Sequence, residues 1–212
     1  MVEANRVRLL SMLGGLMLLV GPGLLRRAIR RALLRQILTL ESAVRRLIYV
    51  AARDMRVTLR ASAPPLGAIS GRPGADNAPV FALIEAPRRP EGAPRRTAPG
   101  HGPRILFLDE ERPADEWRKP TPDDLMETTA LRRRLGAMKA ALDDLPKQAR
   151  RLARWFARQE RTRGTGRFAR LYPIRSGRAP GHREDGKGDV DAVLADCHDL
   201  ALRAREMIEG QA

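Results

Sequence analysis

Few side chains in this chain are of the types that perform covalent or metal chemistry, and their spacing keeps them apart. Cys197 and His198 are adjacent, and neighbouring side chains on a helix point about 100° away from each other. A zinc site needs a spaced set of cysteine, histidine or carboxylate ligands, and neither His101 nor His182 has such a set nearby. The sequence therefore predicts no metal site, and Cys197 is interpreted as a core residue.

The motifs that mark common enzyme classes are absent as well. The glycine-containing segment Asp185–Asp189 (DGKGD) lacks the spacing of a phosphate-binding P-loop. No nucleophile elbow and no Ser/His/Asp pattern occurs in the chain. We expect no catalytic residues and no cofactor, and hence a protein that is not an enzyme.

Electrostatic binding of anions is the chemistry that the composition favours. The 212 residues carry a formal net charge of +15, and only 4% of them are aromatic, which argues against a large globular core. Such a charge favours lipid headgroups, nucleic acid or acidic protein surfaces as partners. The candidate anion- or partner-binding residues are Arg150, Arg151, Arg154, Trp155 and Arg158.

These C-terminal residues have two interpretations. Arginines beside aromatic side chains contact phosphates and stack on bases, which makes nucleic-acid binding through residues 147–183 the alternative function. The same pattern fits an amphipathic helix with a solvated basic face, in which Trp155 or Phe156 is the buried anchor. Both interpretations stay open at the level of the sequence.

The elements that would position such residues begin with an uncharged run, Leu9–Leu25. As one helix this run would measure about 26 Å, slightly less than the roughly 30 Å of a bilayer's hydrocarbon core. Pro22 and the glycines around it weaken a helix further, so the run is a marginal transmembrane helix. Arginines and no small-residue cleavage site follow it, which argues against a signal peptide.

A second helix is predicted from Leu24 to about Thr58, with apolar residues spaced by three and four. Arginines, Arg45 and Arg46 among them, occupy the opposite side. A basic amphipathic helix beside an apolar run is typical of an interfacial membrane element, although it would equally pack its stripe against another helix. The predicted membrane-contacting residues are Leu9, Leu13, Leu16, Leu19, Leu25, Arg26, Arg27, Arg30, Arg31 and Ile37.

The excess of arginine after Leu25 predicts that the rest of the chain stays in the cytoplasm. The expected location is therefore the cytoplasmic face of the inner membrane, with the cytoplasm as the alternative.

Residues 61–120 are rich in proline and glycine and predict a disordered linker. Two apolar islands that end in an acid interrupt it, Phe81–Glu85 and Ile105–Asp109. Each island would dock on a partner's sheet edge or groove or form a weak local hairpin.

Helices are predicted again after the linker. Thr121 followed by Pro122 resembles a helix start, and a heptad seam of apolar residues follows, which is typical of coiled-coil packing. Pro146 interrupts the seam, and Asp143 and Asp144 can cap a new helix that has Pro146 in its first turn. We therefore expect two helices, residues 122–143 and 145–162, either kinked or folded into a hairpin. The expected units are residues 1–60, 61–120, 121–162, a basic linker at 163–188, and a final amphipathic helix at 189–210.

Several blocks of sequence are also familiar. The segments Leu142–Trp155 (LDDLPKQARRLARW), Pro180–Arg183 (PGHR) and Val190–Leu202 (VDAVLADCHDLAL) resemble a family of small, arginine-rich bacterial proteins, and Gly100–Glu110 (GHGPRILFLDE) is similar to a further block of that family. The resemblance implies a bacterial origin and a shared C-terminal module, and it brings no activity or catalytic residues.

Together these patterns predict a mainly α, non-compact protein: long N-terminal helices, a disordered linker and a small C-terminal bundle or hairpin. The expected function is that of a non-enzymatic, membrane-associated helical adaptor. Its expected partners are an anionic membrane surface and a protein, with self-association possible and nucleic acid as the alternative.

Overall fold

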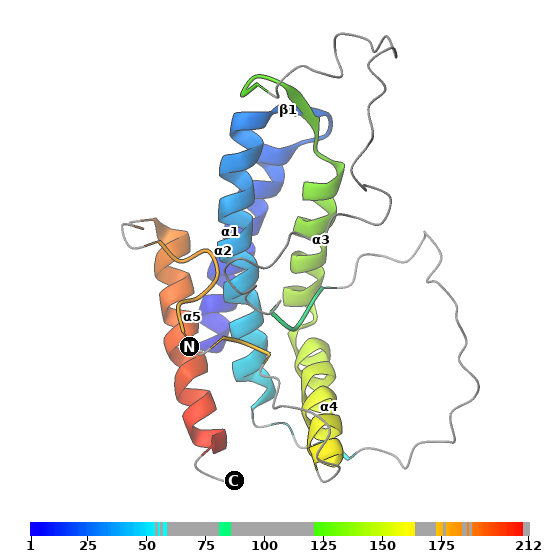
Figure 1. Ribbon diagram of the computed structural model, residues 1–212, viewed down its shortest axis with the longest axis vertical. Helices are drawn as coiled ribbons and strands as arrows, with labels where there is room; N and C mark the ends of the chain where they lie inside the picture. The colour runs from blue at the N-terminus through cyan, green and yellow to red at the C-terminus, as the bar shows by residue number, and fades with distance from the viewer. Residues whose placement is uncertain are drawn as a thin grey trace, which may run out of the picture.

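The computed structural model describes residues 1–53, 55, 57–58, 81–85, 121–163, 173–175, 177–183, 186 and 188–209. This part of the chain is mainly helical with little strand, which confirms the predicted fold class (Figure 1). The elements are α1 (Val2–Val20), β1 (Leu24–Arg26), α2 (Arg27–Ala52), β2 (Leu125–Glu127), α3 (Thr129–Asp143), α4 (Leu145–Arg163) and α5 (Asp189–Glu209).

The uncharged run near the start is divided between elements and is not one helix. Helix α1 begins at Val2 and ends at Val20, and Gly21 then adopts a φ of 34°. Such a positive φ suits glycine, and Pro22 cannot donate the backbone hydrogen bond that a continuing helix needs. Among the described helices, none combines the length and apolar character required to cross a bilayer.

The chain then forms β1, which pairs with β2 although about a hundred residues separate them. The pairing is antiparallel, with Leu24 opposite Glu127 and Arg26 opposite Leu125. The helix start predicted at residue 122 is therefore wrong. Thr121 donates from its backbone N–H and its hydroxyl to the Asp124 carboxylate at 2.7 and 2.6 Å, which forms a turn into β2, and α3 begins only at Thr129.

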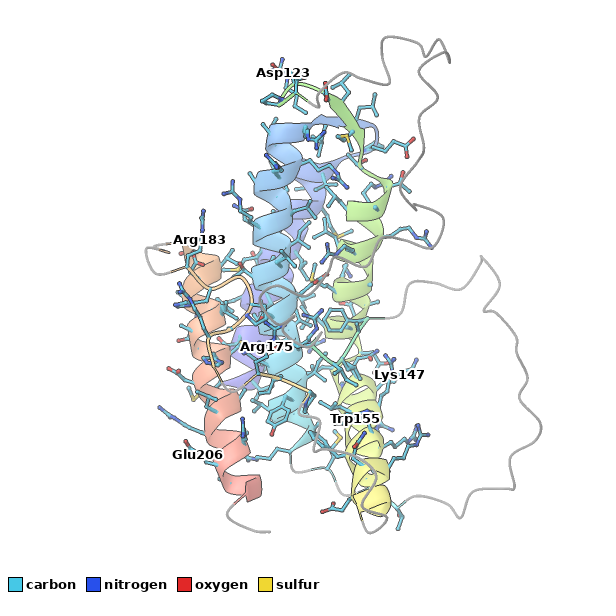
Figure 2. The ribbon with its side chains drawn as sticks, in the orientation of Figure 1. Asp123, Lys147, Trp155, Arg175, Arg183 and Glu206 are labelled. Atoms are coloured by element: carbon cyan, nitrogen blue, oxygen red, sulfur yellow. The ribbon has the colours of Figure 1, made fainter. Side chains whose placement is uncertain are left out.

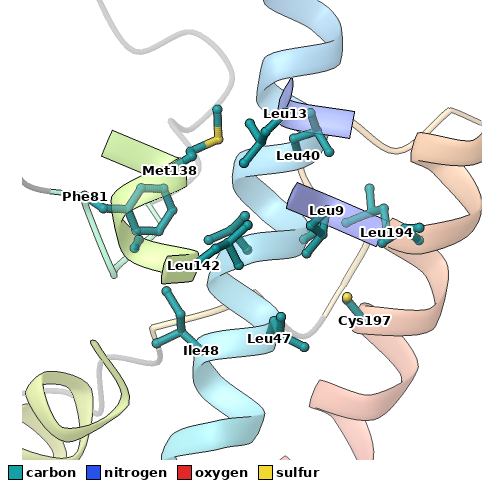
Figure 3. Packing of buried hydrophobic residues seen from close by; sticks show 14 of the residues in the cluster. Leu9, Leu13, Leu40, Leu47, Ile48, Phe81, Met138, Leu142, Leu194 and Cys197 are labelled. Carbon is teal, nitrogen blue, oxygen red and sulfur yellow. The ribbon is translucent and has the colours of Figure 1, made fainter. Parts of the chain in front are cut away.

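Helix α2 is the centre of the bundle, because it contacts α1, α3, α4 and α5. The units predicted as separate, residues 1–60 and the C-terminal helices, thus share one core. Figure 3 shows Leu9 of α1 close to side chains of α2 and α5. From Leu33 to Ile48 the apolar stripe of α2 is buried in this core, as the packed-helix alternative expects, whereas Ile29 at its start is 49% exposed.

The seam predicted after the linker is also buried, from Leu131 in α3 to Leu152 in α4. Asp144 separates the two helices, and its carboxylate accepts a hydrogen bond from the Lys147 N–H at 3.2 Å. This is the expected cap, with Pro146 in the first turn of α4, where its missing N–H costs little. The final helix begins at Asp189, as predicted.

Candidate functional site

One end of the bundle combines the end of α1, both strands and the start of α2; we call it the tip (residues 17–31 and 121–128). Hydrogen bonds fix its shape. The N–H groups of Arg27 and Ala28 donate to the carbonyls of Asp124 and Pro122 at 2.8 and 2.9 Å. Because the first N–H groups of a helix lack partners within the helix, the segment before β2 acts as a backbone cap for α2.

The short sheet gives the tip two unlike faces. In both strands the central residue, Leu25 or Met126, is half-buried, and the residues on either side of it are exposed. Alternation of this kind follows from the pleat of a strand. Leu24 and Leu125 therefore lie on the outer face, where they are 57% and 62% exposed.

The end of α1 adds further exposed apolar surface to the tip. Leu18 is 85% exposed and Leu19 is 66% exposed. A single exposed leucine needs no explanation, but a cluster on one end of a molecule marks a contact with a protein or a membrane.

Four arginines also belong to the tip: Arg26, Arg27, Arg30 and Arg31. Arg26 forms an exposed ion pair with Asp123 at 3.6 Å, which contributes little stability. Arg27 forms a partly buried pair with Asp124 at 3.9 Å. Arg30 and Arg31 have no ion pair with any residue that the structure describes. The Nε of Arg30 is buried and lacks a hydrogen-bond acceptor within the same part of the chain.

The predicted membrane-contacting residues divide into two groups. Six of them lie at the tip: Leu19, Leu25, Arg26, Arg27, Arg30 and Arg31. The other four are buried in the core, so the prediction that they contact lipid is wrong: Leu9, Leu13, Leu16 and Ile37. The physical reason is that α2, α3 and α5 cover the face of α1 that carries the three leucines, and that the neighbouring helices likewise cover Ile37 on α2.

The predicted anion-binding residues of α4 lie at the other end of the bundle from Asp123 (Figure 2). Arg150, Arg151, Arg154 and Arg158 are exposed. Trp155 is half-buried, with its ring edge-to-face on Phe156 at 5.4 Å between centroids. The aromatic residues thus pack as anchors, while the arginines form the outer face of the helix.

A further group of residues escaped the sequence analysis. Arg46, predicted on the exposed side of α2, is fully buried and forms an ion pair with Glu85. The Arg46 Nε also donates to the Nδ1 of His198 in α5 at 3.0 Å. Burial lowers the pKa of Arg46, against the opposing effect of Glu85, and burial together with the Arg46 charge lowers the pKa of His198.

Glu85 ends the first apolar island, which docks within the chain. Phe81 and Leu83 join the core, and the Glu85 N–H donates to the Pro173 carbonyl at 2.8 Å. Neither a partner's surface nor a local hairpin is needed to bury this island. The second island, residues 105–109, lies outside the described residues. The acid that ends the apolar pentad is the sequence signal that could have indicated a buried cation partner.

Within the described part of the chain, no cluster of three or more histidine, cysteine or carboxylate side chains is arranged to hold a metal ion. No family model, curated protein or solved structure matches this chain.

Proposed function

We propose that this protein is a non-enzymatic, membrane-associated helical adaptor that uses its tip to bind an anionic bilayer surface. The observation that carries the proposal is the outer face of the β1–β2 sheet, where Leu24 and Leu125 are exposed and Arg26 lies opposite Leu125. This combination of apolar and basic side chains is the one that interfacial membrane-binding elements use.

The magnitudes support shallow binding to the bilayer surface. Moving an exposed leucine fully out of water contributes about 1.5–3 kcal/mol, and each basic residue near an anionic leaflet contributes about 1 kcal/mol. The summed binding free energy of the four exposed leucines, Arg30 and Arg31 is larger than that of a single weak lipid anchor. Of the three acids at the tip, Asp123 and Asp124 form ion pairs with arginines, whereas Glu127 is exposed opposite Leu24 and opposes binding to an anionic surface.

The adaptor role rests on the distance between the tip and α4. The row of exposed arginines on α4 lies at the opposite end of the bundle from the tip (Figure 1). An acidic face of a protein partner is complementary to this row, and such complementarity increases the rate of association. The bundle would therefore hold a partner close to the cytoplasmic face of the inner membrane.

Sedimentation with vesicles tests the membrane contact. The Leu24→Ser/Leu125→Ser variant should bind phosphatidylglycerol-containing vesicles at least ten times more weakly than the unaltered protein. Leu38→Ser is the control, because Leu38 is a 43% exposed leucine of α2 outside the tip. Circular dichroism should show equal helix content in all three proteins. Equal binding by the tip variant and the unaltered protein would refute the proposal.

Nucleic-acid binding through residues 147–183 is the second candidate, and the exposed row Arg150, Arg154 and Arg158 favours it. The affinity of such a site falls steeply with salt as phosphate contacts release counterions. Arg150→Gln/Arg154→Gln should then weaken binding to single-stranded DNA at low salt and flatten its salt dependence. Trp155 is half-buried against Phe156, so only part of its ring is exposed for stacking on a base.

A further inference from the structure

We propose that a groove beside the tip binds one acyl chain of an anionic lipid, with Arg132 and Arg133 contacting its charged head. This inference rests on the proposed membrane function, because it names the molecule that the protein would take from the bilayer. The groove lies between the end of α1 and the first three turns of α3 and has a volume of about 570 Å³. Binding sites for small molecules measure roughly 300–1,000 Å³.

The groove exists because α3 has small residues where it faces the end of α1. Gly136 and Ala137 line it opposite Met17 and Pro22. A Cβ atom built on Gly136 would meet no other atom within 4 Å, so the space above this glycine is open. The lining is mostly apolar, and it suits a hydrocarbon chain better than a polar ligand.

The charges at the groove select an anionic head. Three consecutive arginines occur in α3, and only Arg134 has a structural role, since it donates two hydrogen bonds of 2.8 Å to the Glu41 carboxylate. This interaction raises the pKa of Arg134. Arg132 and Arg133 line the groove, are exposed and form no ion pair with the residues that the structure describes. They are therefore available to a phosphate or carboxylate group.

The position of the groove favours a lipid over a peptide. Gly21 and Pro22 belong both to the tip and to the groove lining, and Leu18 follows Met17 on α1. An acyl chain that leaves the bilayer beneath the tip would enter the groove without passing through water. This favours transfer, because contact between apolar surface and water is unfavourable.

A soluble probe separates the groove from the tip. We would titrate the full-length protein with 11-(dansylamino)undecanoic acid, without vesicles, and follow dansyl fluorescence. Gly136→Leu should fill the groove and weaken binding at least tenfold, whereas Gly136→Ala should change it less than twofold. Both substitutions introduce better helix formers, so both melting temperatures should rise, and lost binding would not reflect unfolding.

Charge is tested by Arg132→Gln/Arg133→Gln, which should weaken binding of the acid about tenfold and that of its methyl ester much less. Equal probe binding by Gly136→Leu and the unaltered protein would overturn the inference. So would a dimer of the unaltered protein that Gly136→Leu dissociates, because a second copy would then occupy the groove.

The same variant distinguishes this inference from the proposed function. Gly136→Leu keeps every tip leucine and should sediment with vesicles like the unaltered protein. If the probe does not bind while vesicle binding is normal, the groove inference fails and the membrane function stands. If the probe binds but vesicles do not, the membrane function fails.

Discussion

The guanidinium of Arg46 and the carboxylate of Glu85 form an ion pair in which the side chains are 0% and 2% exposed. The same carboxylate accepts a hydrogen bond from the Arg175 N–H at 2.9 Å through its other oxygen. A single glutamate thereby joins α2, the Phe81–Glu85 island and the segment before α5. Removing two charges from water is costly, so such a pair is stable only when hydrogen bonds complete it.

Replacing Glu85 with glutamine should therefore destabilise the fold strongly. The substitution leaves the Arg46 charge buried and uncompensated, and losses of about 3–5 kcal/mol in unfolding free energy are typical. Urea denaturation followed by circular dichroism measures the change. Asp123→Asn removes a partner of the exposed pair with Arg26 and should cost less than about 1 kcal/mol. Similar losses for the two variants would contradict the interpretation.

Stability should decrease as the pH falls through about 6.5, the ordinary pKa of histidine. In the folded protein burial lowers the pKa of His198, and Arg46 lowers it further; the neighbouring Asp199 and Glu85 oppose this and His182 adds to it. Between the two pKa values the unfolded chain binds a proton that the folded protein does not, so acid favours unfolding. One proton gives a slope of at most about 1.4 kcal/mol per pH unit.

Urea denaturation between pH 7.5 and 5.5 tests this. His198→Gln does not titrate and keeps an acceptor for Arg46, so its stability should depend less on pH than that of the unaltered protein. The other histidines are present in both proteins. If the unfolding free energy of both depended on pH equally, the pH dependence would come from those histidines and not from His198.

Gly181 should tolerate no side chain. Its φ is 83°, and a Cβ atom would lie 2.7 Å from the Thr39 hydroxyl and 2.8 Å from the Thr39 backbone. Gly181→Ala should destabilise the fold by about 1–3 kcal/mol, through strain and loss of the contact with α2. Gly177→Ala is the matched control in the same segment, because its Cβ would meet nothing within 4 Å. Thermal melts of the two variants measure the difference. Equal melting temperatures would contradict the prediction.

The thiol of Cys197 should be inert in the folded protein. It is fully buried, and burial, assisted by Asp196, raises its pKa to about 12. Since the thiolate is the reactive form, Ellman's reagent should label the native protein at pH 8 more than a hundred times more slowly than the urea-unfolded chain. Rapid labelling in native buffer would show that α5 is not packed as described.

Local patterns in the sequence predicted the helices that depend on local signals. The seam from Leu131 to Leu152, the Asp144 cap and the start of α5 each follow from spacing or capping within a few residues. The sequence did not predict the strands, because a three-residue strand is too short to show periodicity. The two strands also lie about a hundred residues apart in the sequence.

The tip was predicted only in part, for a physical reason. An uncharged run has the same pattern whether lipid or protein covers it. The sequence therefore could not distinguish the buried Leu9 and Leu13 from the exposed Leu18 and Leu19. Arg46 presented the same difficulty. Its neighbours on α2 indicated a basic face, and the glutamate that neutralises it comes from a segment with no helical pattern.

The burial of α1 also has a consequence for synthesis. Helix α1 is synthesised before α5, but Leu194 and Cys197 of α5 join Leu9 in the core. About 170 residues separate the end of α1 from the start of α5, and at roughly 5–20 residues per second a ribosome needs about 8–34 s to make them. Helices α2 and α3 are made earlier, but the part of α1 that packs on α5 stays uncovered for this whole interval. The nascent chain therefore exposes apolar surface of α1 to chaperones before α5 can cover it.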